Sequence, residues 1–123
     1  MSESSFTRIE ATTTFQRKLR TLAKKYRRIR QDIEPILEQL QRGELPGDRI
    51  PGVGYNVFKL RVRNSDIQKG KSSGYRLIYY VKTTTAILLL DIYAKSEQSD
   101  ISIDDIRRII VEYDRGNGDL GDR

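Results

Sequence analysis

The spacing of apolar residues changes along the chain, and each spacing predicts a different element. Residues 6–10 alternate in the manner of a short strand. Apolar residues then recur at intervals of three or four in two consecutive stretches, which predicts two amphipathic helices. Their apolar stripes are Phe15, Leu19, Leu22 and Tyr26, followed by Ile29, Ile33, Ile36, Leu37 and Leu40. The two helices would form a hairpin with one apolar side.

Local residues indicate where these helices begin and end. The hydroxyls of residues 12–14 can cap the free backbone N–H groups of the first helix, which we expect to end near Tyr26 or Arg27. Gly43 is a natural stop for the second helix. Pro35 lacks a backbone N–H, so the second helix is expected to begin only shortly before it. Residues 44–54 are rich in proline and glycine and predict a loop.

Three strands are predicted next, at residues 55–63, 73–81 and 86–95. Side chains alternate between the two faces of a strand. In the first strand one face is apolar (Phe58, Leu60, Val62), and the other carries cations about 7 Å apart (Lys59, Arg61, Arg63). Arg76 and Lys82 are expected on one face of the second strand. The third strand begins apolar on both faces, which is typical of a central strand covered on both sides.

The last predicted element is an amphipathic helix. Ser102 and Asp105 have the spacing of a capping box, and an apolar stripe follows them (Ile103, Ile106, Ile110, Tyr113). Residues 114–123 have nothing to bury and are expected to be disordered. The chain is therefore predicted to be one α+β domain over residues 1–113. In it a short strand and a helical hairpin pack on an antiparallel sheet, with a helix at the C-terminal end.

The composition restricts the chemistry that the protein can perform. The 123 residues include no cysteine and no histidine. This excludes a disulfide framework, a thiol nucleophile and the usual zinc sites, and it removes the commonest general base. The sequence contains neither an apolar run of transmembrane length nor an apolar N-terminal signal segment, so we expect a cytoplasmic protein.

Charge is distributed unevenly along the chain. The formal net charge is +6. Residues 15–30 contain eight cations and no acid, and residues 59–82 contain seven cations against Asp66. Residues 97–123 hold eight acids against four arginines. A basic body with an acidic end favours polyanionic partners, nucleic acid above all.

Three stretches resemble the RelE/ParE toxin superfamily of type II toxin–antitoxin modules, most closely its RelE-type and HigB-like members. They are FKLRV (58–62), GKSSGYRLIYYV (70–81) and LLLDIYAKSEQSDIS (88–102). The resemblance extends over residues 6–113 and implies a RelE-like fold. It also implies an mRNA interferase, that is, a ribosome-dependent endoribonuclease that cleaves mRNA in the ribosomal A site and inhibits translation. No metal or cofactor is implied, and a cognate antitoxin would neutralise the toxin.

The resemblance also implies a set of site residues. Lys59, Arg61, Arg76 and Lys95 match the family's catalytic basic positions. Further RNA contacts are expected from Arg63, Lys71, Lys82 and Tyr93, and ribosome contacts from Arg17, Lys18, Lys24, Lys25 and Arg28. The chain departs from the family at Ser96, where the best-known members have arginine, and residues 98–103 lack the family's stacking tyrosine. The proton donor and the stacking aromatic are therefore unassigned, with Tyr93 and Tyr113 as substitutes.

Cleavage by a ribose 2′-hydroxyl needs a proton acceptor, a stabilised phosphorane and a proton donor for the leaving oxygen. A cluster of cations meets the second need. Because like charges disfavour protonation, Lys59 within such a cluster is a candidate for the base. Arg61 and Arg76 stay protonated and are better suited to hold phosphate. Asp91 and Glu97 are the acids near the site in sequence, with orienting or structural roles.

Other interpretations of the same residues remain open. Cations that alternate along a strand are also typical of any solvated sheet face. The superfamily fold allows a ParE-like toxin that inhibits DNA gyrase by binding and performs no chemistry. It also allows a nucleic-acid-binding module without activity. Lys59, Arg61 and Arg76 on one face favour the nuclease, because a protein that only binds gyrase would not need that cluster.

Overall fold

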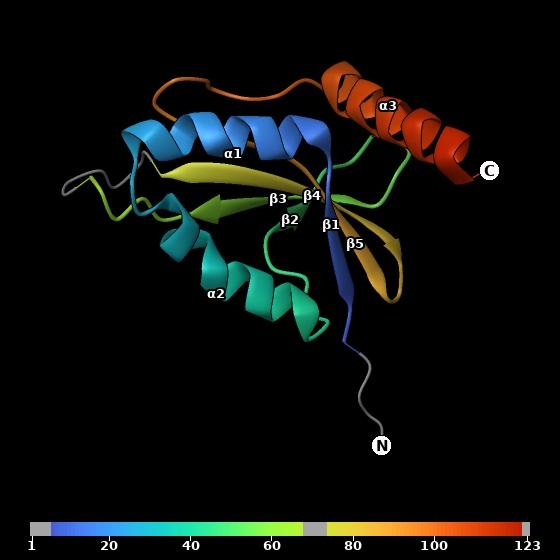
Figure 1. Ribbon diagram of the computed structural model, residues 1–123, viewed down its shortest axis with the longest axis horizontal. Coiled ribbons are helices and arrows are strands. Elements are labelled where there is room, and N and C mark those ends of the chain that lie inside the picture. Colours follow the sequence, from blue (N-terminus) through green and yellow to red (C-terminus); the bar gives the residue numbers. More distant parts are fainter. Residues whose placement is uncertain (1–5, 68–73, 122–123) are drawn as a thin grey trace.

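The computed structural model describes residues 6–67 and 74–121, with side chains up to residue 116. Its elements follow one another along the chain as a strand, two helices, four strands and a helix (Figure 1). They are β1 (Arg8–Ala11), α1 (Thr13–Lys25), α2 (Ile29–Gln41), β2 (Asp48–Arg49), β3 (Val57–Val62), β4 (Tyr75–Thr83), β5 (Ala86–Ala94) and α3 (Ile103–Gly121). The predicted α+β class and the predicted order of the main elements are confirmed.

The strands form one five-stranded sheet in the order β1-β5-β4-β3-β2. Strands β2 to β5 are antiparallel neighbours, whereas β1 pairs with β5 in parallel. The predicted antiparallel sheet is confirmed for β2 to β5, and the short N-terminal strand adds a parallel edge to it. A helical hairpin rather than a tight turn follows β1. The connection therefore does not require the neighbouring strand to run antiparallel to β1.

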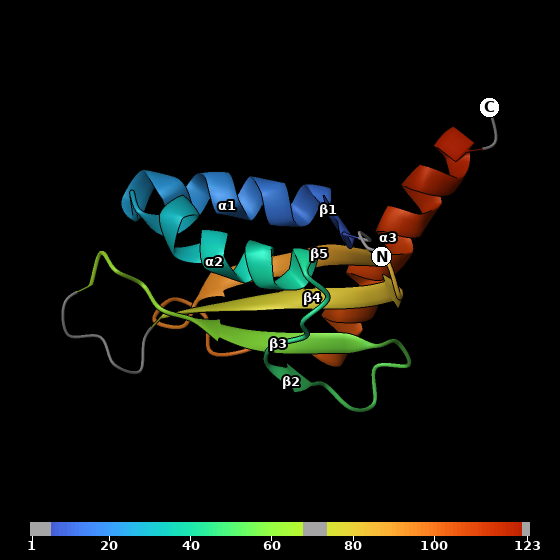
Figure 2. The same cartoon turned by 90° about the horizontal axis from the view of Figure 1, so that it is seen from below.

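Helices cover both faces of the sheet (Figure 2). Helices α1 and α2 pack on one face, where residues such as Phe15, Ile29 and Leu40 meet the sheet residues Leu77 and Tyr79. Helix α3 packs on the other face, where its isoleucines meet Val57, Ile78, Leu88 and Leu90. All of β5 is buried, as its pattern predicts, although the middle strand of the five is β4.

The predicted helix ends are partly confirmed. The Thr12 hydroxyl caps α1, and Gly43 follows α2 with a φ of 89°, a conformation that glycine adopts without strain. The expectation that α2 begins only shortly before Pro35 is wrong, because α2 begins at Ile29 and Pro35 lies inside it. Pro35 and Gln31 are both exposed, so water can satisfy the Gln31 carbonyl that loses its helical partner.

Two further features differ from the sequence expectations. Helix α3 is capped by Ser102, whose hydroxyl accepts a hydrogen bond from the Asp105 N–H at 3.1 Å, but it continues to Gly121 where we expected disorder from residue 114. No proline interrupts that stretch, so the helical hydrogen bonding can propagate. Strand β2 lies in the predicted loop, and Gly47 permits its approach, since a Cβ there would lie 2.5 Å from the Lys59 carbonyl oxygen.

Thr12 fastens the start of α1 to the sheet. Its buried hydroxyl donates to the Leu90 carbonyl at 2.8 Å and accepts from the Phe15 N–H at 2.9 Å. We therefore expect Thr12→Ala to lower the free energy of unfolding by about 1–2 kcal/mol in urea denaturation. The exposed neighbour supplies the control, and Thr13→Ala should change stability by less than about 0.5 kcal/mol. Equal losses in both variants would contradict this role of Thr12.

Within residues 6–67 and 74–121, no helix is both long and apolar enough to cross a membrane. The single-domain boundary at residue 113 stays a prediction.

Candidate functional site

Three adjacent strands bring the predicted catalytic cations together on the face that α3 covers only in part. Arg61 on β3 lies directly opposite Arg76 on β4, and Arg76 lies directly opposite Tyr93 on β5. Lys59 precedes Arg61 by one full period of the strand, and Lys95 follows Tyr93 by the same interval. We refer to Lys59, Arg61, Arg76 and Lys95 as the cationic cluster.

The pairing of Arg61 with Arg76 is electrostatically unfavourable by itself. Like charges on directly opposite strand positions are destabilising by up to about 1 kcal/mol. In the described part of the chain, neither guanidinium has an ion-pair partner, and the polar contact of the Arg76 side chain is a 3.2 Å hydrogen bond from Nη1 to the Tyr75 carbonyl. A bound anion would relieve the repulsion between Arg61 and Arg76. The pair is therefore suited to bind a phosphate group.

An acid that the sequence did not single out enters the cluster. The Lys59 ammonium contacts Asp100 Oδ1 at 3.0 Å, and the Tyr93 hydroxyl donates to the same oxygen at 3.4 Å. The Lys59 contact and the Ile101 N–H together hold the pKa of Asp100 below its ordinary value. Burial above all raises the pKa of Tyr93 to about 12, with the charge of Asp100 adding to the rise. Tyr93 therefore stays neutral near pH 7.

The connection from β5 to α3 holds this acid in place. It spans residues 95–102, which we call the connecting strap. The Lys95 ammonium donates to the Ser99 carbonyl at 2.7 Å, and the Gln98 amide donates to the Asp100 carbonyl at 2.9 Å. The strap also carries Glu97, which contacts Lys25 on α1 at 3.0 Å. Sequence reasoning missed Asp100 because it lies 41 residues from Lys59, although it belongs to the motif at 88–102.

The structure separates the other predicted RNA contacts. Arg63 is exposed just beyond the end of β3, on the cluster side, whereas Lys71 lies outside the described residues. Lys82 lies about 20 Å along β4 from Arg76. Its ammonium is 3.9 Å from Glu10 Oε1 and 5.2 Å from the ring centroid of Tyr113. Lys82 is therefore not part of the cluster.

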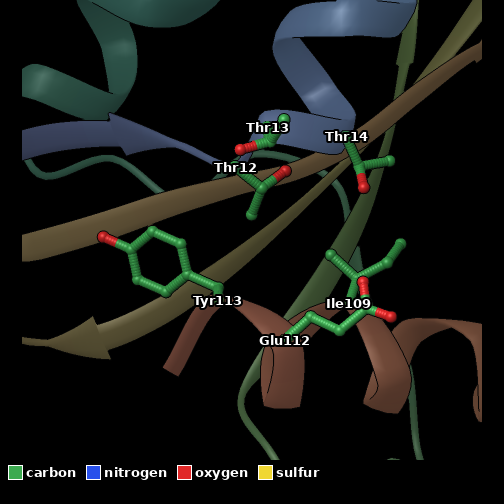
Figure 3. A pocket seen from close by; sticks show the side chains of 6 residues that line it. All are labelled: Thr12, Thr13, Thr14, Ile109, Glu112 and Tyr113. Carbon is green, nitrogen blue, oxygen red and sulfur yellow. The ribbon is translucent and has the colours of Figure 1, made fainter. Parts of the chain in front are cut away.

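Neither substitute aromatic is presented to the cluster for base stacking. The Tyr93 side chain is only 3% exposed, within the core beneath α3. Tyr113 donates its hydroxyl hydrogen bond to Glu10 and borders a small pocket of about 170 Å³ (Figure 3). That pocket lies between the start of α1 and α3 and is lined by no residue of the cationic cluster. The stacking aromatic remains unassigned.

The basic residues of α1 lie on the opposite face of the sheet from the cluster. Lys18 lies 2.9 Å from Asp91 Oδ1 outside hydrogen-bond geometry, so this buried oxygen has an ion pair but no directed hydrogen bond. Arg17, Lys24 and Arg28 are exposed. The turn after α1 reaches the cluster end of the sheet, where the Arg28 N–H donates to Asp66 Oδ2 at 2.9 Å (Figure 2). The basic surface of α1 and the cationic cluster, on opposite faces of the sheet, therefore meet around this end of the molecule.

A larger polar pocket of about 610 Å³ opens at the edge of β5 that β1 leaves unpaired. Helix α1, helix α3 and the connecting strap border it, and Asp91 and Asp100 both line it. In the described residues no group of three or more acidic side chains could hold a metal ion.

Comparison with known proteins identifies the family. A search of the curated proteins found no match. A family model described as the ParE toxin of the type II toxin–antitoxin system parDE matches residues 9–99. The match runs from β1 into the connecting strap, and it includes every member of the cationic cluster. The chain therefore belongs to the ParE toxin family of type II toxin–antitoxin systems, within the RelE/ParE toxin superfamily.

Proposed function

We propose that this toxin is a ribosome-dependent endoribonuclease that cleaves mRNA and thereby inhibits translation. The observation that carries the proposal is the pair of arginines, Arg61 and Arg76, on directly opposite strand positions without an ion-pair partner in the described residues. Lys59 lies one strand period before Arg61 on β3, and Lys95 directly follows the end of β5. Such an arrangement stabilises the extra negative charge of a phosphorane.

The members of the cationic cluster have different roles in the proposed reaction. The 2′-hydroxyl attacks the adjacent phosphorus and leaves a cyclic phosphate and a free 5′-hydroxyl. Arg61 and Arg76 fit the phosphate oxygens, because guanidinium groups stay protonated and bind them in a bidentate manner. The Lys59 ammonium forms an ion pair with Asp100 at 3.0 Å. Lys59 is therefore better suited to stabilise negative charge than to act as the base.

Ribosome contact is expected at the basic end of α1. Phosphate-backbone binding is additive in charge and needs no exact geometry. The exposed cations Lys24 and Arg28 lie around the end of the sheet from Arg63, so one stretch of RNA can contact both surfaces. Membership of a type II family implies a cognate antitoxin, and an acidic or amphipathic segment of that partner would complement the cationic cluster.

A second candidate is inhibition of DNA gyrase by binding alone, the activity associated with ParE-type toxins. It is favoured by the hydrogen bonds that hold both Lys59 and Tyr93 to Asp100 and by the lack of an assigned stacking aromatic. A surface of this kind can bind a partner without turnover.

Expression of the toxin in bacteria, with mapping of transcript ends, separates the two candidates. Cleavage predicts new ends within translated codons soon after induction. The double variant Arg61→Ala/Arg76→Ala serves as the control and should leave transcripts intact. Intact transcripts with wild-type toxin, together with a DNA-damage response, would support gyrase inhibition and refute the nuclease.

A further inference from the structure

Asp100 holds a carboxylate in the cationic cluster with one oxygen fixed and the other open. Its Oδ1 accepts from Lys59 at 3.0 Å, from the Tyr93 hydroxyl at 3.4 Å and from the Ile101 N–H at 2.8 Å. Among the described residues, no hydrogen bond reaches its Oδ2. The side chain is 64% exposed. A carboxylate anchored in this way has a set orientation and a free lone pair for a substrate proton.

An acid at the position of Asp100 would weaken phosphate binding on a surface that only binds RNA. A carboxylate beside Lys59 repels phosphate and cancels part of the cluster's charge. An ion pair as exposed as this one adds little to stability, so a purely structural role explains it poorly. A cleavage reaction, in contrast, requires a proton acceptor at this place.

The other groups near the cluster are less suited to accept the proton. The chain has no histidine. Asp91 is buried in its ion pair with Lys18, and both Lys25 and the Tyr26 hydroxyl contact Glu97 Oε2. The Lys59 side chain already forms an ion pair with Asp100 Oδ1 at 3.0 Å. Asp100 is the carboxylate that contacts the cluster itself, and it also borders the 610 Å³ pocket, whose lining includes no member of the cationic cluster.

We propose that Asp100 is the general base of the cleavage reaction, an assignment that rests on the proposed ribonuclease activity. Its Oδ2 takes the proton of the 2′-hydroxyl while the 2′-oxygen forms a bond to phosphorus. The bond between phosphorus and the 5′-oxygen breaks, and the leaving oxygen takes a proton from water. Asp100 then returns its proton to solvent, and Lys59 with Arg76 offsets the charge of the phosphorane.

The charged groups around Asp100 affect the pKa of its carboxyl group. Lys59 faces it from β3 and Tyr93 from β5, and further charged groups line the same pocket from α1, β5 and α3: Arg17, Lys18, Asp91, Asp105, Arg108 and Glu112. Lys59 first and the Ile101 N–H second keep the pKa of Asp100 below its ordinary value. Asp100 is therefore ionised near pH 7, and the rate should fall only as the pH drops through this lowered pKa.

The test compares Asp100→Asn with wild type in single-turnover cleavage of mRNA on purified ribosomes. We expect a loss in rate of about 10² or more, with ribosome binding unchanged or tighter because a negative charge is removed. The fall in rate at acidic pH should disappear in the variant. Asp104→Asn is the matched control, because the Asp104 side chain is 93% exposed on α3, and it should cleave at the wild-type rate.

A double-variant comparison separates a base from a residue that merely positions Lys59. If Asp100 accepts the proton, Asp100→Asn lowers the rate further in a Lys59→Ala background. Equal rates for Lys59→Ala with and without Asp100→Asn would overturn the assignment and leave a positioning role. An Asp100→Asn variant as fast as wild type would overturn it while cleavage itself stands. Absence of cleavage by wild-type protein would overturn the proposed function and this assignment together.

Discussion

Replacing Arg76 with alanine is expected to lower mRNA cleavage about a hundredfold or more, a loss on the order of 3 kcal/mol in transition-state stabilisation. Arg76 lies between Arg61 and Tyr93 in one row across three strands. A phosphate held by that row would lose one of its two opposed guanidinium groups. The folded domain, in contrast, loses a like-charge repulsion, so its stability should hold or rise slightly.

Three measurements check this expectation: growth arrest on induction, mapped transcript ends and thermal unfolding of the purified variant. Arg42→Ala is a matched control, because this arginine is exposed after α2, contacts Glu44 at 3.2 Å and lies outside the cluster. It should keep full toxicity. A folded Arg76→Ala protein that still cuts transcripts and arrests growth would refute the role of Arg76.

The faces of the sheet could be predicted because side chains in a strand alternate without exception along a regular stretch. That rule correctly separated Leu60 and Val62, which are buried under the helical hairpin, from Arg61, which is exposed. The same rule placed Lys82 on the face of Arg76, and its ammonium does lie on that face, over the Tyr113 ring of α3. Alternation does not give the distance along the strand, however, and the length of β4 places Lys82 beside Glu10, away from Arg76.

The set of residues that make up the candidate site could not be predicted in full, because it depends on contacts between distant parts of the chain. Nothing in the sequence specifies that Arg61 lies opposite Arg76, because residues 63–74 separate the two strands along the chain and leave the register open. Asp100 reaches Lys59 only because the connecting strap crosses back from the end of β5. A short strand at residues 6–10 was predicted, but its parallel pairing with β5 was not, since a strand of four residues has too little pattern to specify its neighbour.

The second large effect concerns the basic end of α1. Reversing Lys24, Lys25 and Arg28 to glutamate is expected to weaken ribosome association strongly, and wild-type binding should fall steeply as salt rises. Each lost phosphate contact should reduce the slope of log affinity against log salt by about 0.7 to 0.9. Lys25 should contribute least, because Glu97 already contacts it at 3.0 Å.

A control variant that makes the same change in net charge at other surface positions tests whether the location of the cations matters for ribosome binding. Each reversal removes two units of charge, so three reversals take the net charge from +6 to zero. The triple variant Arg8→Glu/Arg42→Glu/Arg49→Glu makes the same change at exposed positions away from the turn after α1, and it should keep most of the affinity. Equal losses in the two triple variants would show that net charge alone drives binding. Wild-type binding that does not respond to salt would contradict an RNA target and point to a protein partner such as gyrase.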